Sequence, residues 1–513
     1  MLLPPDTGFC ILPGRKNIVN IQQPIYLQIA GIIGDKIINL VFPTGTKLPP
    51  ERELAALFGV SRTTAINAYR YLEQQGMVVT RVGSGTYVAE LADGREDEGP
   101  AVPWVQLMTP FPQMPLSTVL REILNISVSD GSISLAAGMP DPALYPADIL
   151  HQIVARSDKG INPADLGHIA TEGYGPLRRL VAEMLADRGI STGTDKVMIT
   201  AGSQQGLYLI SKALLEPGDY VVVESPTFIG AHQVFRASGA RILSLPLGGP
   251  FPFALLEDYL VRYRPKLMYL IPTYHNPTGR VMPETERREL LRLAARHRLV
   301  VLEDDPYSDL CYGEKPPASL KAMDTYGGVV YLSTFSKILF PGLRTGYVAA
   351  HPALLNRMAM EKQFIDLHTN NLAQWLLCRL LESGALPVHL ELVSREYKKR
   401  RDALAKALRR QCGDDLSFET PQGGFYLWCR LNRLVSSSRL LHEATREGLS
   451  FVPGEAFYAY PPEGEREIRL CFATHTEDQL QEATRRLARA LAGVRKAGKE
   501  KEVPANQTVK PII

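Results

Sequence analysis

The stretch "STFSKILFPGLRTG", residues 333–346, places Lys337 between hydroxyl side chains on one side and a Pro-Gly-Leu-Arg turn on the other. The apolar run "GGVVYLS", residues 327–333, leads directly into it. Similar runs alternate with helical segments earlier in the chain: "KVMIT", "DYVVVE", "LMYLIP" and "LVVLEDD". Short apolar runs separated by helices are typical of a mainly parallel sheet covered on both faces. The pattern therefore predicts a large α/β unit that contains this lysine.

The composition sets limits on the rest of the chain. At 513 residues the chain is longer than one hydrophobic core usually serves, so two or three folding units are expected. A formal net charge of +3 is too small to indicate a partner. The six cysteines form no CxxC pair, which argues against a zinc site or a disulfide framework and favours a reducing cytoplasm. No run of about 18 apolar residues occurs, so no membrane span is predicted. The amino terminus has no charged start followed by a continuous apolar core, so no signal peptide is predicted. No metal site is expected.

The amino-terminal part has a different pattern. Residues 24–41 carry apolar side chains at spacings of three and four, which predicts an amphipathic helix. The segment "PPERELAALFGVSRTTAINAYRYLEQQG", residues 49–76, reads as two helices around a tight turn, with Ser61 as the N-cap of the second. "MVVTRVGSGTYVAE", residues 77–90, follows as a glycine-centred hairpin. This order predicts a winged helix-turn-helix over residues 21–90.

A helix-turn-helix places the start of its second helix in the major groove of DNA. The side chains expected to face DNA lie there, at the start of the preceding helix and in the wing: Arg52, Ser61, Arg62, Thr63, Thr64, Arg81 and Gly83. A winged fold used only for protein contact is the alternative. Since residues 21–90 carry six Lys/Arg against five Asp/Glu, charge does not decide between the two.

The order of the motifs distinguishes these two alternatives better than the charge does. Residues 47–88 closely resemble the GntR family of bacterial winged-helix regulators in a Leu-Pro-x-Glu-Arg-x-Leu-Ala run, a Val-Ser-Arg-x-Thr turn and a Gly-x-Gly-Thr wing. The resemblance implies a double-stranded DNA operator as partner and places Arg52, Arg62 and Gly83 at DNA-contacting positions. Ile66 departs from the pattern, because some members of the family carry a further arginine there.

The remaining chain divides by composition. Residues 91–130 begin with the acidic, Gly- and Pro-containing stretch "LADGREDEGPAVP" and are predicted to be a linker. Residues 131–493 form the second unit, in which the chain after about Ala385 becomes helix-rich and ends in the strands "GGFYLWCRL" and "REIRLCFA". That part predicts a smaller α/β lobe. Residues 494–513 are charged and lack periodicity, so a disordered tail is expected.

The surroundings of Lys337 suggest a chemistry. A lysine that forms a Schiff base with pyridoxal 5'-phosphate (PLP) needs donors for the phosphate, an acid near the pyridine nitrogen and donors for the ring oxygen. For the phosphate, residues 202–204 begin a helix after the strand "KVMIT", where free backbone N–H groups favour an anion. Further donors flank the lysine. The expected phosphate ligands are Gly202, Ser203, Gln204, Thr334, Ser336 and Arg344.

Other residues could contact the pyridine ring of PLP. Asp304 in "LEDDPY" ends a strand and could keep the pyridine nitrogen protonated. Tyr307 and Asn276 could donate to the ring oxygen, and Phe228 could stack on the ring face. Taken singly, each has a plainer interpretation: a strand-ending aspartate is often a helix cap, Asn-Pro-Thr-Gly is often only a turn, and a Ser-Lys pair is usually on the surface.

In this order the motifs resemble the fold-type I aminotransferases, from about Ser134 to Ala492. The resemblance implies that Lys337 carries the Schiff base and that Asp304 rather than Asp305 is the pyridine partner. It also implies that Arg469 grips a substrate α-carboxylate, for which a strand-edge salt bridge is the alternative.

Two further positions follow from the same resemblance. Gly138 matches a glycine that closes over the substrate. His168 stands where relatives place a tyrosine that reaches the phosphate of the partner subunit, and a histidine could still donate there.

Together the two units resemble the MocR/GabR subfamily of GntR regulators. This implies a multidomain protein: an α+β winged helix-turn-helix, then an α/β PLP-dependent transferase fold of type I with a large domain and a smaller carboxy-terminal lobe. It further implies a head-to-tail, domain-swapped homodimer on two DNA half-sites, with PLP, an amine or an amino acid as the signal. A working aminotransferase with a DNA-binding appendage is the alternative, and amino-acid turnover would distinguish it.

Overall fold

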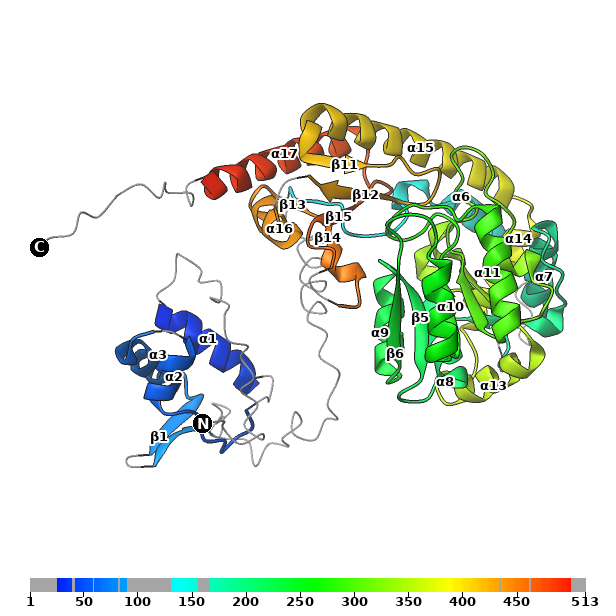
Figure 1. Cartoon of the computed structure of the whole chain (residues 1–513). Helices are drawn as coiled ribbons and strands as arrows, with labels where there is room; N and C mark the ends of the chain where they lie inside the picture. Colours follow the sequence, from blue (N-terminus) through cyan, green and yellow to red (C-terminus); the bar gives the residue numbers. More distant parts are fainter. Residues whose placement is uncertain are drawn as a thin grey trace, which may run out of the picture. The chain divides into compact units, whose positions relative to one another are not determined.

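A computed structural model describes residues 25–38, 42–58, 60–81, 84–89, 131–155, 167–432, 435–460 and 463–499 (Figure 1). The chain divides into two compact units, residues 1–111 and 112–513. Each unit has its own hydrophobic core. The predicted linker, residues 91–130, lies outside the described residues.

The first unit is a winged helix-turn-helix. Its elements are α1 (Ile25–Ile38), α2 (Glu51–Phe58), α3 (Arg62–Gln74) and the antiparallel hairpin β1 (Val78–Arg81) and β2 (Gly85–Val88). Apolar side chains spaced for one helix face meet in its core: Ile29, Ile33, Leu54, Ala65, Ala68 and Leu72. Ser61 caps α3, because its hydroxyl accepts a hydrogen bond from the backbone N–H of Thr64 at 3.2 Å. The predicted fold of this unit is confirmed.

The second unit is built on a seven-stranded sheet of order β4–β10–β9–β8–β7–β5–β6 (Figure 1). The strands are β4 (Val197–Thr200), β5 (Tyr220–Ser225), β6 (Arg241–Pro246), β7 (Leu267–Leu270), β8 (Val300–Asp304), β9 (Val329–Thr334) and β10 (Gly346–Ala349). Only β10 runs antiparallel to its neighbours, so the sheet is mainly parallel, as predicted. The strands β6 and β10 are additional to the five predicted runs.

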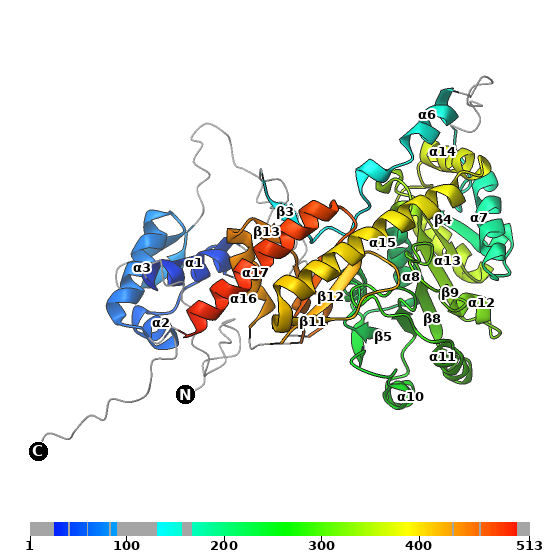
Figure 2. The same ribbon diagram turned by 90° about the horizontal axis from the view of Figure 1, so that it is seen from above.

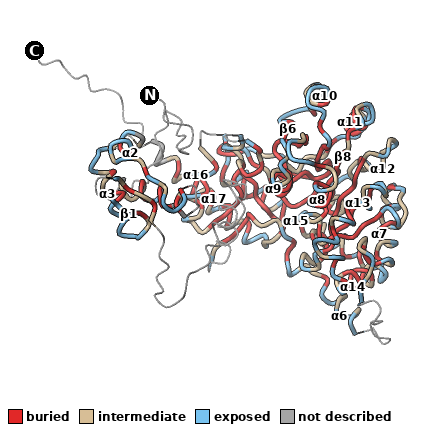
Figure 3. Tube along the Cα trace, turned by 90° about the horizontal axis from the view of Figure 1, so that it is seen from below, coloured by how far each residue is buried: buried red, intermediate tan, exposed pale blue. Residues whose placement is uncertain are grey.

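Helices cover both faces of this sheet (Figure 2). They include α7 (Gly175–Asp187), α8 (Ser203–Leu214), α9 (Ile229–Ala237), α10 (Phe253–Arg262), α11 (Glu284–His297), α12 (Leu320–Met323), α13 (Pro352–Gln363) and α14 (Asn371–Glu382). Val221 and Val223 pack with α8, α9 and α13, whereas Val222 between them packs with α10 and α11. Because successive side chains of a strand point to opposite faces, the strands read as continuous apolar runs. Figure 3 shows these strands buried and the outer turns of α10 and α11 exposed.

The predicted smaller lobe is present after residue 385. Its antiparallel sheet has the order β11 (Leu416–Phe418), β12 (Tyr426–Leu431), β15 (Glu467–Cys471) and β14 (Val452–Pro453). The helices α15 (Leu386–Gln411), α16 (Ser437–Arg446) and α17 (Glu477–Lys499) pack with it. The parallel pair β3 (Ile133–Ser134) and β13 (Leu449–Ser450) joins this lobe to the start of the unit, and α6 (Ala147–Ala155) packs on α14.

The prediction of a disordered tail from residue 494 is wrong for residues 494–499. The helix α17 continues to Lys499. Its apolar residues recur at spacings of three and four up to Val494, which is 3% exposed and packs in the core, so burial extends the helix beyond the point where the polar sequence suggested an end. Residues 500–513 lie outside the described part of the chain. None of the described helices combines the length and apolar character needed to cross a membrane.

Candidate functional site

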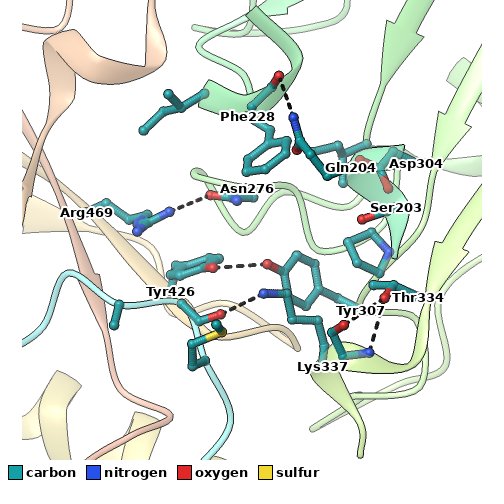
Figure 4. A pocket seen from close by; sticks show the side chains of 18 of the residues that line it. Ser203, Gln204, Phe228, Asn276, Asp304, Tyr307, Thr334, Lys337, Tyr426 and Arg469 are labelled. Atoms are coloured by element: carbon teal, nitrogen blue, oxygen red, sulfur yellow. Dashed lines mark hydrogen bonds between the residues drawn. The ribbon is translucent and has the colours of Figure 1, made fainter. Parts of the chain in front are cut away.

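A cavity of about 550 Å³ lies in the second unit between the large domain and the smaller lobe (Figure 4). The strands and helices contribute their ends to its wall: β8 ends at Asp304, β9 ends at Thr334, α8 begins at Ser203, and β15 adds Arg469. Most of the predicted site residues line it: Gly138, Ser203, Gln204, Phe228, Asn276, Asp304, Tyr307, Thr334, Ser336, Lys337, Arg344 and Arg469.

One end of the cavity is suited to bind an anion. Gly202 precedes α8 without a side-chain cap, so the first N–H groups of the helix, on Ser203 and Gln204, have no partner within the helix. Gly202 has φ +84°, and a Cβ there would come within 2.7 Å of Nη2 of Arg344. Glycine is therefore required at this position by both the backbone angle and the close approach of the guanidinium.

The end of β9 adds donors to the same region. The hydroxyls of Thr334 and Ser336 lie 3.1 Å apart, and Nη1 of Arg344 donates to the Ser336 hydroxyl at 3.4 Å. Within the described ranges, no ion pair includes Arg344. A helix amino terminus, two hydroxyls and one guanidinium without a carboxylate partner form a site that fits a phosphate group.

The cavity wall also holds a buried carboxylate. Oδ2 of Asp304 accepts a hydrogen bond from the Tyr269 hydroxyl at 2.7 Å, whereas its Oδ1 is buried and has no hydrogen-bond partner among the described residues. Burial raises the pKa of Asp304 to about 7, and Asp305 also raises it, while the Tyr269 hydroxyl and Lys337 lower it. An N–H group in the cavity would satisfy Oδ1, so the protonated nitrogen of a pyridine ring fits here.

The neighbouring carboxylate has another role. Asp305 accepts a hydrogen bond from the Tyr331 hydroxyl at 2.7 Å and is absent from the cavity wall. Of the two consecutive aspartates, only Asp304 is therefore placed to meet a ligand in this cavity.

Hydrogen-bond donors for a ring oxygen also line the cavity. Oδ1 of Asn276 accepts a hydrogen bond from Nη1 of Arg469 at 3.1 Å, which leaves the amide nitrogen as a donor. The hydroxyls of Tyr307 and Tyr426 lie 3.0 Å apart. Phe228 lines the same cavity beside Gln204, in the position of a stacking ring (Figure 4).

Lys337 extends into the middle of the cavity. Its Nζ donates to the carbonyl oxygen of Gly138 at 2.7 Å. Burial lowers the pKa of Lys337 to about 8; Arg469 and Arg344 lower it further, while Cys471 and Asp304 raise it. A larger share of this amine is therefore neutral near pH 7 than for an ordinary lysine, which favours attack on an aldehyde.

Arg469 is a buried cation that is ready to bind a carboxylate. It is 6% exposed, its Nη2 donates to the carbonyl oxygen of Ala136 at 2.6 Å, and its Nε is buried with no hydrogen-bond partner among the described residues. Its guanidinium lies 4.2 Å from the Tyr426 ring centroid. No described carboxylate pairs with it, so the alternative of a strand-edge salt bridge finds no support here.

Sequence reasoning missed two tyrosines, Tyr269 and Tyr426. Each lies inside a buried strand, where an apolar run gives no signal for a polar role. Tyr426 is brought to the site by the pairing of β12 with β15. A Cβ at Gly138 would overlap its hydroxyl, so this pairing also explains the glycine at that position.

His168 does not line the cavity. It is exposed, and its ring lies edge-on against His368 with the ring centroids 5.5 Å apart. Its predicted contact involves the partner subunit and stays a prediction.

The predicted DNA-facing residues of the first unit lie on its surface. Arg52, Arg62 and Thr63 are exposed. Nη2 of Arg62 lies 3.8 Å from a carboxylate oxygen of Glu51, too far for a strong ion pair, so its guanidinium stays available for bases. Arg81 lies at the end of β1.

The other predicted DNA-binding residues differ in how accessible they are. Ser61 and Thr64 hydrogen-bond each other, with 2.8 Å between their hydroxyl oxygens, so capping occupies part of their capacity. Gly83 lies outside the described residues.

Comparison with known proteins finds a matching family for each of the two units. The family "Bacterial regulatory proteins, gntR family" matches residues 25–88, and "Aminotransferase class I and II" matches residues 133–487. A 2-aminoadipate transaminase of Thermus thermophilus is 39% identical over 382 residues, covering 74% of this chain and 94% of that protein. The HTH-type transcriptional regulator YisV of Bacillus subtilis is 33% identical over 462 residues, covering 90% of this chain and 94% of that protein.

Solved structures match the second unit. The α-aminoadipate aminotransferase LysN of Thermus thermophilus, complexed with N-(5'-phosphopyridoxyl)-L-leucine, has a TM-score of 0.70 and 37% identity over 77% of this chain and 100% of that one. Kynurenine aminotransferase of Pyrococcus horikoshii, in complex with PMP, has a TM-score of 0.70 and 34% identity, covering 79% of this chain and 98% of that one. This chain belongs to the aminotransferase class I and II family and, with a gntR-type helix-turn-helix ahead of that domain, has the architecture of the MocR-type transcription regulators.

Proposed function

We propose that this protein is a PLP-dependent transcription regulator whose aminotransferase-like domain senses an amino compound or PLP itself. The observation that carries the proposal is one cavity whose residues fit PLP, on the same chain as a helix-turn-helix with an exposed Arg62. The similarity to YisV supports it, since that regulator matches 90% of this chain and therefore both units.

The cavity residues have separate roles toward PLP. When bound, PLP supplies an aldehyde that reacts with primary amines and a ring that withdraws electrons. Ser203, Gln204, Thr334, Ser336 and Arg344 would hold its phosphate. In addition, Asp304 would keep the ring nitrogen protonated, Asn276 and Tyr307 would donate to its ring oxygen, and Lys337 would hold it covalently.

The hydrogen bonds of the cavity suggest how an amino acid would be sensed. Lys337 donates to the Gly138 carbonyl, and Arg469 donates to the Ala136 carbonyl. An amino acid would bring its amine to the position of Lys337, where it would compete with Nζ for the Gly138 carbonyl, and its carboxylate to Arg469, where it would compete with the Ala136 carbonyl. Because both carbonyls belong to one short segment near the start of the second unit, binding would shift the equilibrium between two positions of that segment.

The arrangement of subunits belongs to the same proposal. We infer a cytoplasmic, domain-swapped homodimer that reads two DNA half-sites, with residues 21–90 as the DNA-binding domain, 91–130 as the linker and 131–493 as the PLP-binding domain. The exposed His168 lies against the half-buried His368, and His168 would be available there to a partner subunit.

Replacing Arg62 with alanine should weaken binding to operator DNA by about 1–3 kcal/mol, because a guanidinium at the start of a recognition helix forms paired hydrogen bonds to a base. Arg62→Lys should recover only part of the affinity, since lysine keeps the charge and loses the fork. The absorbance of bound PLP should stay unchanged in both variants. Titration of a labelled operator fragment measures the effect, with the exposed Arg179→Ala in α7 as control. Unaltered affinity of Arg62→Ala would remove α3 from the DNA interface.

A working aminotransferase is the second candidate, because most of the predicted site residues line the cavity and a transaminase is 39% identical over the same domain. If the protein is a sensor, it should convert no more than about one equivalent of amino acid per bound PLP when it is mixed with a panel of amino acids and a keto acid. Chromatography measures product formation, and the DNA affinity is measured in the same mixtures. Sustained multiple turnover with any pair would favour the enzyme over the sensor.

A further inference from the structure

The wing of the first unit contains a third extended segment. Residues 45–48 run alongside β2: the N–H of Leu48 donates to Thr86 at 2.8 Å, and the N–H of Val88 donates to Thr46 at 2.9 Å. Lys47 forms an antiparallel bridge with Tyr87. The wing is therefore a small three-stranded arrangement with β2 in the middle.

The strand register puts two cations and one ring on the same face. Tyr87 lies directly opposite Lys47 on one side and opposite Val79 on the other. Arg81 is two residues beyond Val79 on β1, so its side chain points to that face as well. Lys47 and Arg81 are both exposed there.

The ring of Tyr87 lies close to both cations. Nζ of Lys47 lies 5.9 Å from the ring centroid, and the guanidinium carbon of Arg81 lies 5.0 Å from it. The Tyr87 hydroxyl is 2.7 Å from that of Ser84. The pKa of Tyr87 lies below its ordinary value, because Ser84 hydrogen-bonds to its hydroxyl and Lys47 and Arg81 are close.

Neither cation has a carboxylate partner in the part of the chain that the structure describes. No ion pair of the described residues includes Lys47 or Arg81. Gly85, with φ +118°, borders the lysine: a Cβ there would come within 3.1 Å of Cε of Lys47, so glycine leaves room for the extended lysine. Two cations that share one aromatic ring at the surface, with no carboxylate partner among the described residues, favour the binding of an anion.

We infer that Lys47 and Arg81, positioned by Tyr87, together bind one backbone phosphate of the DNA on which α3 rests. Lys47 stands outside the helix-turn-helix and outside the predicted hairpin, so spacing in the sequence does not reveal it. The site contributes affinity and register rather than base recognition. The inference rests on the proposed DNA-binding function and adds to α3 a separate contact with the DNA backbone.

The test uses the full chain and a mixed-sequence duplex DNA, because phosphate contacts dominate non-specific binding and no operator is needed. Lys47→Ala should weaken binding several-fold and reduce the slope of log K against log salt by up to about 0.9, the contribution of one phosphate contact. Lys47→Arg should keep both. Lys212→Ala is the matched control, since Nζ of Lys212 lies 5.8 Å from the Tyr208 ring in the other unit.

A double-variant cycle tests the shared phosphate. If Lys47 and Arg81 bind the same group, the losses caused by Lys47→Ala and Arg81→Ala should not add in the double variant. Additive losses, or a Lys47→Ala protein with unchanged affinity and salt slope, would overturn the inference while leaving the DNA-binding function in place. A wild-type protein that fails to bind duplex DNA would overturn both. Thermal unfolding of each variant, expected to be unchanged for these exposed side chains, separates loss of binding from loss of fold.

Discussion

Replacing Lys337 with alanine should give a folded protein that never acquires the yellow absorbance of covalently held PLP, at any concentration of added cofactor. The reason is chemical: within the cavity wall, Lys337 supplies the only primary amine. Borohydride reduction followed by peptide mass spectrometry should find a phosphopyridoxyl group on Lys337 of the wild-type protein. Lys337→Arg should also lack it, since arginine keeps the charge and not the nucleophile. A colourless wild-type protein at saturating PLP would contradict the assignment of the cofactor.

The same lysine predicts a pH dependence. Because burial lowers the pKa of Lys337 to about 8, the neutral amine becomes the major form as the pH rises through that value. The rate at which cofactor-free protein acquires PLP absorbance should therefore increase from pH 7, reach half of its maximum near pH 8 and level off by about pH 9. Stopped-flow absorbance measures this rate. A rate that keeps rising toward pH 10 would mean that the lysine has its ordinary pKa in solution.

Replacing Asp304 with alanine should weaken PLP binding on the order of 100-fold, because a hydrogen bond to a charged group contributes about 1.5–3 kcal/mol and the buried Tyr269 hydroxyl would also lose its partner. Asp304→Asn should retain the Tyr269 hydrogen bond and lose only the charge that holds the pyridine nitrogen protonated. Its affinity should therefore lie between those of the wild type and the alanine variant. Equilibrium dialysis against PLP gives the three dissociation constants.

The adjacent carboxylate provides the matched control. Asp305 is equally buried, accepts a hydrogen bond from Tyr331 and is absent from the cavity wall. Asp305→Asn should therefore leave PLP affinity within about twofold of the wild type, and any effect should appear in thermal stability instead. Equal losses of PLP affinity in Asp304→Asn and Asp305→Asn would mean that both act through the fold, and that neither holds the ring.

Much of this protein could be predicted from local patterns. The period of its apolar residues predicted a winged helix-turn-helix and a mainly parallel sheet, because burial imposes a spacing of three to four on helices and continuous apolar runs on parallel strands. Where burial did not match the local composition, the prediction was wrong: α17 continues past Val494 on its buried face although the sequence around it is charged.

The candidate site, too, could be predicted only in part from local patterns. Short motifs were sufficient to select Lys337, Asp304 and Asn276, because each acts from a fixed position at the end of a strand or in a turn. Motifs could not assign Tyr269, whose partner Asp304 lies 35 residues away on the neighbouring strand. Nor could they assign Lys47, which only the pairing of residues 45–48 with β2 brings onto Tyr87.

The sequence by itself determined the two units, their order and the identity of most of the groups that would bind PLP or DNA. The tertiary structure alone decided which of those groups are free to act. It left Oδ1 of Asp304 and Nε of Arg469 buried without partners within the described ranges, and it joined Lys337 to Gly138 across 199 residues and Arg469 to Ala136 across 333. The physical reason is that periodicity and capping are local, whereas the desolvation and hydrogen bonding of a side chain depend on residues that the fold brings from distant parts of the chain.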